Sequence, residues 1–211
     1  MKQPAIQKPE DISEVLLHAC CAPCSSAIVE WMMANGIRPV IYYFNQNIWP
    51  REEYEIRKQE SKRHAESLGL RWIDGDYNHE EWLGGVCGLE SEPERGRRCE
   101  RCFTLRLIAA AKQAQALGIE YFTTTLASSR WKSLEQINRA GLIAEQTVSQ
   151  SPLPNQPSPK FWAQNWRKGG LYERRNQLLK EYQFYNQQYC GCEFSMRPKS
   201  TEIKENIKND E

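Results

Sequence analysis

The sequence predicts an α/β domain with a mostly parallel sheet, because short apolar runs alternate with helical segments about four times along the chain. The apolar runs are rich in β-branched and aromatic residues, which is typical of strands that are buried on both faces. Three of the helical segments end directly before a glycine, a common helix terminator. We expect residues 1–196 to form this single domain and residues 197–211 to form a polar, flexible tail.

Each element is expected from its local pattern. Strands are expected at residues 15–19, 38–44, 70–73 and 121–126. Helices are expected at residues 25–35, 53–68, 104–117, from the capping box at 133–136 onward, and at 171–182. Residues 149–160 contain four prolines, so we expect a loop that joins neither a helix nor a sheet ladder. The part of the chain that follows this loop is expected to be helical.

Composition and charge exclude several classes of protein. A hydrophobic content of 40% and a charged content of 26% are globular values and exclude wholesale disorder. The apolar runs are far shorter than the roughly 20 residues that cross a bilayer, and residues 1–10 contain no apolar signal segment, so we expect a cytoplasmic protein with no membrane partner. Because 28 basic residues balance 27 acidic ones, any nucleic-acid site must be local.

Cysteine is the residue type that points most directly to chemistry. The chain has eight cysteines and three histidines, and in a reducing compartment we expect no disulfide scaffold. Seven of them lie in three short groups, which favours metal or redox chemistry over inert core thiols: Cys20, Cys21 and Cys24; Cys99 and Cys102; Cys190 and Cys192. The eighth, Cys87, is expected to be a small core residue.

The position of the first two groups is informative. Cys20 and Cys21 directly follow the first expected strand, at the end where open α/β sheets bind ligands. Cys99 and Cys102 are expected to precede a helix, whose N-terminal dipole stabilises thiolates. Thiolate sites suit zinc or an iron-sulfur cluster, and spacing does not choose between them. Because neighbouring side chains diverge in a strand, the Cys20-Cys21 pair favours a cluster over a single ion.

The remaining candidates each keep two interpretations. Cys190 and Cys192 are further metal ligands or a redox-active dithiol, and Gly191 between them allows tight geometry. His18 is more often a hydrogen-bonded core histidine than an acid. Asp76, with Asp74, follows the third expected strand and is a candidate for proton delivery or metal ligation, although Asp-Gly-Asp is also common turn chemistry.

Two segments suit a nucleic-acid or nucleotide substrate. Residues 92–106 contain five arginines around the second cysteine pair, and residues 161–180 interleave cations with tryptophan and tyrosine. This pattern fits phosphate contact with base stacking, and equally a solvated helix face with core tryptophans. Neither a phosphate-loop lysine motif nor a dinucleotide-binding glycine motif is present, so ATP hydrolysis and dinucleotide binding lack support.

Together these motifs resemble the QueH-type epoxyqueuosine reductases, and the similarity runs from about residue 14 to residue 195. It rests on five segments, at residues 16–25, 42–54, 92–103, 123–126 and 189–195. The sequence departs from the family pattern at residues 127–131, where many relatives have a different stretch that contains Ser-Pro.

The resemblance implies a Rossmann-like domain akin to nucleotide hydrolases and a reductase for the last step of queuosine synthesis in tRNA. It also implies a [4Fe-4S] cluster and a second, mononuclear iron beside the cluster. By matching motif, Cys20, Cys21, Cys99 and Cys102 are the implied cluster ligands. Cys190 and Cys192 are an implied redox-active pair or additional ligands, and Cys24 is a further candidate ligand.

The implied reaction agrees with the residues. Converting an epoxide to an alkene and water requires two electrons and two protons, and a cluster normally passes electrons singly, so a second redox centre is useful. Asp76 and His18 are the candidate proton donors. The expected partners are tRNA carrying epoxyqueuosine and an electron donor that the sequence does not identify. The segments rich in arginine and tryptophan are expected to hold the anticodon loop with the target base flipped out.

Three other functions remain open at this point. A zinc-stapled RNA-binding module uses the same cysteines without catalysis. A thiol-disulfide oxidoreductase uses Cys99 and Cys102 without a metal. A tRNA sulfur-transfer enzyme requires ATP, and the missing phosphate-loop motif counts against it.

Overall fold

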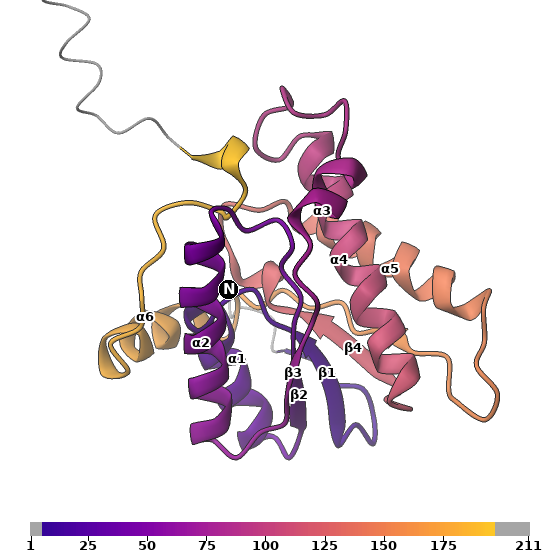
Figure 1. Cartoon of the computed structure of the whole chain (residues 1–211). Coiled ribbons are helices and arrows are strands. Elements are labelled where there is room, and N and C mark those ends of the chain that lie inside the picture. The colour runs from indigo at the N-terminus through magenta and orange to yellow at the C-terminus, as the bar shows by residue number, and fades with distance from the viewer. Residues whose placement is uncertain (1–5, 197–211) are drawn as a thin grey trace, which may run out of the picture.

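A five-stranded sheet forms the centre of the molecule (Figure 1). The computed structural model describes residues 6–196, so the expected tail at residues 197–211 lies outside the described residues. The strand order is β3-β2-β1-β4-β5, and every neighbouring pair is parallel. The strands are β1 (Glu14–His18), β2 (Arg38–Tyr43), β3 (Trp72–Asp74), β4 (Tyr121–Thr124) and β5 (Lys160–Phe161). The predicted α/β class with a parallel sheet is therefore confirmed.

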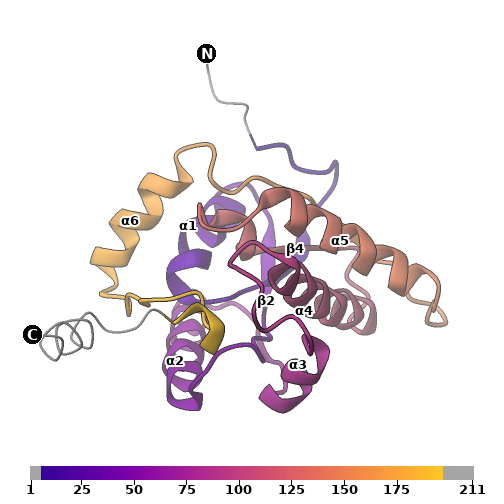
Figure 2. The ribbon, with the colours of Figure 1, turned by 90° about the horizontal axis from the view of Figure 1, so that it is seen from above.

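Helices cover both faces of this sheet. They are α1 (Ala22–Ala34), α2 (Arg51–Ser67), α3 (His79–Gly85), α4 (Arg97–Ala116), α5 (Leu134–Ser149) and α6 (Leu171–Glu181). Two short 3-10 turns, η1 (Thr125–Ser128) and η2 (Glu193–Ser195), follow β4 and end the described chain. Figure 2 shows α1, α2 and α6 on one face and α4 and α5 on the other. None of the helices in residues 6–196 is long and apolar enough to cross a membrane.

The core lies on both faces of the central strands. Val15, Leu16 and Leu17 of β1 are fully buried, so this strand contacts a helix layer on each side. α4 presents small side chains, including Ala110 and Ala114, and contacts both β1 and β4. Small side chains allow this helix to approach the sheet closely. Because α4 returns the chain to the start of a parallel strand, it runs antiparallel to the strands, and its N-terminus lies at their carboxyl ends.

The strand order reverses direction next to β1. The chain runs outward from β1 through β2 to β3, and then returns to place β4 on the other side of β1. The loops that leave β1 and β4 therefore separate to opposite faces, and such switch points are where open α/β sheets bind ligands. Cys20 and Cys21 lie in the first of these loops, and residues 125–133 form the second.

Three helices begin earlier than expected, and for α2 the difference is only from residue 53 to Arg51. α1 begins at Ala22 instead of residue 25, because Pro23 is compatible with the first turn of a helix. α4 begins at Arg97 instead of residue 104, and a carboxylate oxygen of Glu92 accepts a hydrogen bond from the Arg97 N–H at 3.1 Å. The second cysteine pair therefore lies within the first two turns of α4, and the expectation that it precedes the helix is wrong.

Two short elements were not expected. The side chain of Asn78 caps α3 by accepting a hydrogen bond from the Glu81 N–H at 3.1 Å, a polar cap that short-range patterns can reveal. The Lys160 N–H donates to the Glu120 carbonyl at 2.7 Å and starts β5. The prediction that residues 149–160 join no ladder is therefore wrong at Lys160, because only the prolines before it lack an N–H.

Candidate functional site

Three thiols meet where β1 gives way to α1. The Sγ atoms of Cys20, Cys21 and Cys24 all lie within 4.8 Å of one another, and those of Cys20 and Cys21 are 3.9 Å apart. In residues 6–196, no other three side chains of the metal-binding types approach one another this closely. The expected divergence of Cys20 and Cys21 is wrong, because β1 has already ended at His18 and the backbone turns into α1. All three thiols can thus reach one metal ion.

Cys20 has the lowest pKa of this group. Hydrogen bonds from Cys21 and Cys24 hold the pKa of the Cys20 thiol well below its usual range. The hydroxyl of Thr125 also donates to the Cys20 sulfur, at 3.3 Å. The hydrogen bond that each donates to Cys20 raises the pKa of Cys21, and it raises the pKa of Cys24 to about 11. Cys20 is therefore the most acidic of the three thiols, and the N-terminal dipole of α1 also favours a thiolate there.

A second group of thiols lies at the start of α4. Cys102 and Cys192 are buried in one small apolar cluster with Trp82. Burial raises the pKa of Cys99 and of Cys102, and the nearby sulfur of Cys190 raises both further. The backbone N–H of Arg95 donates to the Cys99 sulfur at 3.3 Å. The fold thus brings the second and third cysteine groups of the sequence together.

An ion pair on α2 positions Cys190. Arg57 is 2% exposed, and its Nε donates to an oxygen of Glu53 at 2.7 Å. Its remaining nitrogens donate to the carbonyls of Cys190 at 3.2 Å and Tyr189 at 3.3 Å. Gly191 adopts a φ of +142°, and a Cβ there would lie 3.0 Å from the side chain of Asn47, so this position requires glycine. The sequence analysis missed Arg57, which sits in an ordinary charged helix pattern.

A histidine that the sequence analysis also missed holds the other end of this segment. The Nδ1–H of His79 donates to the Gln46 carbonyl at 2.7 Å, and its Nε2 hydrogen-bonds a carboxylate oxygen of Glu193 at 3.1 Å. The imidazole also stacks on Trp49, with ring centroids 5.1 Å apart. Since Glu193 directly follows Cys192, this contact and the Arg57 contacts fix both sides of the last cysteine pair.

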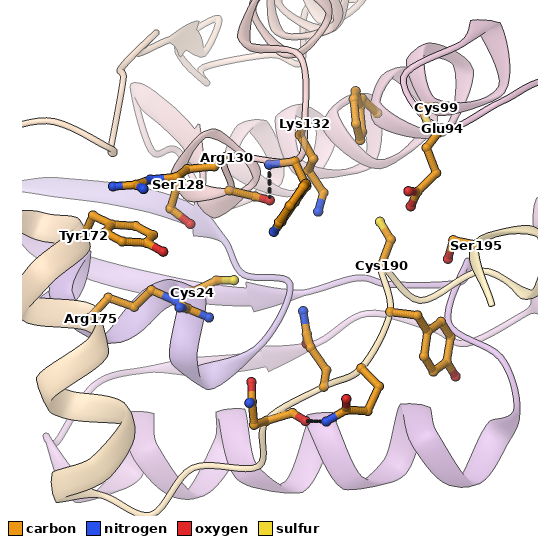
Figure 3. A pocket seen from close by; sticks show the side chains of 17 residues that line it. Cys24, Glu94, Cys99, Ser128, Arg130, Lys132, Tyr172, Arg175, Cys190 and Ser195 are labelled. Atoms are coloured by element: carbon orange, nitrogen blue, oxygen red, sulfur yellow. Dashed lines mark hydrogen bonds between the residues drawn. The ribbon is translucent and has the colours of Figure 1, made fainter. Parts of the chain in front are cut away.

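One cavity of about 410 Å³ is lined by a cysteine from each of the three groups in the sequence (Figure 3). Cys24 comes from α1, Cys99 from α4, and Cys190 from the C-terminal segment. In Figure 3, Lys132 and Cys190 point into the cavity from opposite walls. Burial alone would lower the pKa of Lys132, but the nearby sulfur atoms of Cys190, Cys20 and Cys24 outweigh burial and raise this pKa. The cavity thus combines thiols with a fixed cation.

The residues around the thiols fit an anionic iron-sulfur cluster. Burial raises the pKa of Cys102, while Arg106 and the indole N–H of Trp82 lower it. Arg106 is itself buried and donates a hydrogen bond to the side chain of Asn45. The indole N–H of Trp82 has no oxygen or nitrogen acceptor although it is fully buried, so it is available to sulfur. Cations and N–H donors aimed at sulfur are the surroundings that iron-sulfur clusters require.

The other predicted site residues lie elsewhere. His18 is fully buried: its Nδ1 hydrogen-bonds the Thr124 hydroxyl at 2.8 Å and its Nε2 the Phe44 carbonyl at 3.1 Å. Burial lowers the pKa of His18 to about 3. Asp76 is exposed beyond β3, near the edge of the sheet, and does not line the cavity. Cys87 is exposed after α3, so its predicted core position is wrong, because the chain has turned into a surface loop there.

Comparisons with known proteins give one family. A family model described as epoxyqueuosine reductase QueH matches residues 15–198, a span that contains all seven grouped cysteines. A protein named epoxyqueuosine reductase QueH from Histophilus somni is 42% identical over 195 residues, or 92% of this chain and 77% of that one. Proteins of the same name from Acinetobacter baylyi and Thermotoga maritima are 40% and 35% identical over 93% and 90% of this chain, and over 88% and 95% of their own.

Proposed function

The chain belongs to the epoxyqueuosine reductase QueH family, and from this premise we propose that it converts epoxyqueuosine to queuosine at the wobble position of tRNA. The observation that carries this proposal is the meeting of thiols from three distant segments at one cavity beside the switch point of the sheet. A purely structural metal site needs no cavity. A reductase needs an opening in which a substrate can reach the redox centre.

We assign the cluster ligands from both cysteine-bearing helix termini. Cys20 and Cys21 precede α1, and Cys99 and Cys102 lie in the first turns of α4, so both helix dipoles favour the charge of a [4Fe-4S] cluster. Cys24 lies within 4.8 Å of the first pair and lines the cavity, which suits it to ligate the second iron. When bound, the cluster supplies electrons one at a time.

Cys190 and Cys192 form the redox pair in this proposal. Closing a dithiol to a disulfide releases two electrons and two protons, the number that epoxide removal consumes as the C–O bonds break, the alkene forms and the oxygen leaves as water. An external donor then returns two electrons to the pair. Arg57 holds the Cys190 backbone, and Gly191 allows the two thiols to lie on one tight turn.

In this proposal Lys132 stabilises the departing oxygen. Its ammonium group lines the cavity between Cys24 and Cys190, so its Nζ can donate a hydrogen bond to the oxygen as the C–O bond breaks. Asp76 lies outside the cavity, and both ring nitrogens of His18 are engaged within the core. Lys132 therefore replaces both as the group that contacts the leaving oxygen.

An anaerobic assay tests the proposal. The protein is reconstituted with iron and sulfide and mixed with an anticodon stem-loop RNA that carries epoxyqueuosine, with dithionite as reductant. We expect at least one four-iron cluster per chain and loss of one oxygen atom from the modified nucleoside by mass spectrometry. Zinc without sulfide, with no conversion, would leave a zinc-stapled RNA-binding module. Dithiol exchange without metal would leave a thiol-disulfide oxidoreductase.

A further inference from the structure

Trp131 is exposed at the mouth of the thiol cavity. Its side chain is 77% exposed, more than any other large hydrophobic residue in residues 6–196. It nevertheless lines the cavity that Cys24, Cys99 and Cys190 also line. A single exposed apolar residue is common on a protein surface, so exposure alone does not identify a contact residue. The way in which the surrounding loop is held provides a second observation.

The loop that carries Trp131 is held rigidly by arginines from two other segments. Arg95 donates from Nε to the Trp131 carbonyl at 2.9 Å and from Nη2 to the Arg130 carbonyl at 3.0 Å. Arg167 donates to the next carbonyl, that of Lys132, at 2.8 Å. Three consecutive carbonyls therefore have charged donors. A loop that is ordered before binding loses little entropy on binding, so this indole is preorganised for a partner.

The charges beside Trp131 suit a polyanion. The guanidinium of Arg130 lies 3.5 Å from the ring centroid of Tyr172, which fixes it at the mouth of the cavity. Lys132 and Arg175 also line the cavity, and the acidic side chain that lines it is that of Glu94. Positive charge thus exceeds negative charge around an exposed aromatic ring. Stacking rings flanked by cations are the combination with which proteins bind single-stranded nucleic acid.

The size of the cavity decides which part of an RNA loop meets Trp131. A volume of about 410 Å³ suits one modified base, not several stacked bases. When the modified base enters the cavity, the bases next to it in the loop must stay outside, at the mouth. Trp131 is the exposed aromatic ring at that place.

We propose that Trp131 is a stacking platform for a nucleobase adjacent to the modified nucleoside in the anticodon loop. This inference rests on the proposed function and adds to it the residue that holds the neighbouring base. Trp131 belongs to the stretch of residues 127–131 at which the sequence departs from the family pattern, so the platform is proposed for this chain. Its role is to position the RNA, and it contacts neither the thiols nor the reacting atoms.

The first test measures RNA affinity. The probe is a fluorescein-labelled anticodon stem-loop without the modification, and binding to the reconstituted holoenzyme is followed by fluorescence polarisation. We expect Trp131→Ala to raise Kd by roughly 5- to 150-fold and Trp131→Phe, which keeps an aromatic face, to raise it by less than about threefold. The matched control is Leu142→Ala, which removes a 58% exposed apolar side chain from α5 and should leave Kd unchanged.

The second test identifies the base. Stem-loops with an abasic site directly before or directly after the target position are titrated against wild type and Trp131→Ala. On the RNA that lacks the stacked base, the substitution should have no further effect on Kd, which completes a double-mutant cycle. Iron and sulfide content and the urea midpoint should be the same in all variants.

The possible failures are distinguishable. A wild-type Kd for Trp131→Ala, no coupling to either neighbouring base, or no binding of the stem-loop by wild type would overturn the platform. Failure of wild type to convert epoxyqueuosine in RNA would overturn the proposed function instead, because the binding test uses unmodified RNA and measures no turnover.

Discussion

At the residue scale, the pKa values of the cysteine thiols differ because the immediate neighbours of these thiols differ. The pKa of Cys20 is lowered because Cys21 and Cys24 donate to its sulfur, to which Thr125 donates as well. Cys192 is buried in an apolar cluster, and burial raises its pKa to about 11. The sequence showed which residues can act as ligands. The order in which their thiols lose protons depends on contacts between segments.

Cys99 provides the direct test of the ligand assignment. Cys99→Ala should lose most of the cluster iron and sulfide, because in our assignment its half-buried sulfur is one of the four ligands. The measurement is anaerobic quantitation of iron and acid-labile sulfide per chain. Cys87→Ser is the control, since Cys87 is exposed and outside both thiol groups. Full iron, sulfide and turnover in Cys99→Ala would remove Cys99 from the ligand set.

At the element scale, α2 serves as a scaffold for the C-terminal segment. The hydroxyl of Tyr185 donates to a carboxylate oxygen of Glu53 at 2.7 Å, and the Tyr185 N–H donates to Glu60 at 2.7 Å. Arg57 and Glu53 form a pair with side chains 2% and 9% exposed. One face of α2 thus carries the contacts that hold residues 185–191, although no regular element joins the two segments.

Arg57→Ala should lower the free energy of unfolding by about 3–5 kcal/mol, because Glu53 and two backbone carbonyls are left without their charged donor. Urea denaturation of the metal-free protein measures this change. Arg51→Ala is the control, because its pair with Glu55 is largely exposed and contributes about 0–1 kcal/mol. A loss in Arg57→Ala no larger than that of the control would show that the buried pair does not anchor the segment.

The junction of α2 with the end of α6 should depend on pH. The rings of Tyr182 and Phe184 contact His64 edge-on, each with centroids 5.1 Å away. Burial first, and then the charge of Arg63, lowers the pKa of His64 from 6.5 to about 4. Between pH 4 and pH 6.5 the unfolded chain therefore binds more protons than the folded chain. The stabilisation is therefore complete above pH 6.5 and is lost as the pH falls towards 4.

Because of His64, the free energy of unfolding should be about 2 kcal/mol lower at pH 5 than at pH 7.5. Urea midpoints at the two pH values measure the loss. His64→Phe keeps a ring between Tyr182 and Phe184 but cannot be protonated, so its stability should change less over the same interval. Equal losses in wild type and His64→Phe would assign the pH dependence to other groups.

At the scale of the whole molecule, the thiol site joins segments that are far apart in the sequence. Its thiols come from the β1–α1 loop, from α4 and from the C-terminal segment. In our proposal the cluster joins the β1–α1 loop to α4, so the folded chain binds it and the unfolded chain binds it far less. The free energy of cluster binding therefore adds to the free energy of unfolding.

Removing the cluster should lower stability by about 4 kcal/mol, the value for a ligand present at a thousand times its Kd, or roughly 10 °C in Tm for a chain of this length. Anaerobic thermal unfolding before and after chelation measures the difference. In Cys99→Ala the two curves should nearly coincide. A Tm that does not change on chelation of the wild type would show that the cluster does not link these segments.

Much of the fold could be predicted because the signals are local. The apolar runs, the glycines after helices and the three short cysteine spacings each depend on neighbouring residues, so they predicted the parallel sheet, its helices and a thiol-based site at the end of β1. α3 and β5 were missed because each is short. The start of α4 was misplaced because the contact that caps it comes from Glu92.

The sequence by itself therefore determined the α/β class, the seven thiols and, through their motifs, the family. The tertiary structure decided how those thiols divide into two groups, which cation faces them and which residue stands exposed at the cavity mouth. Lys132, Arg57 and Trp131 have no distinctive spacing, and their roles exist only because residues far apart in the chain meet around them. Chemistry that depends on residue type is local, whereas burial, charge and exposure depend on long-range packing.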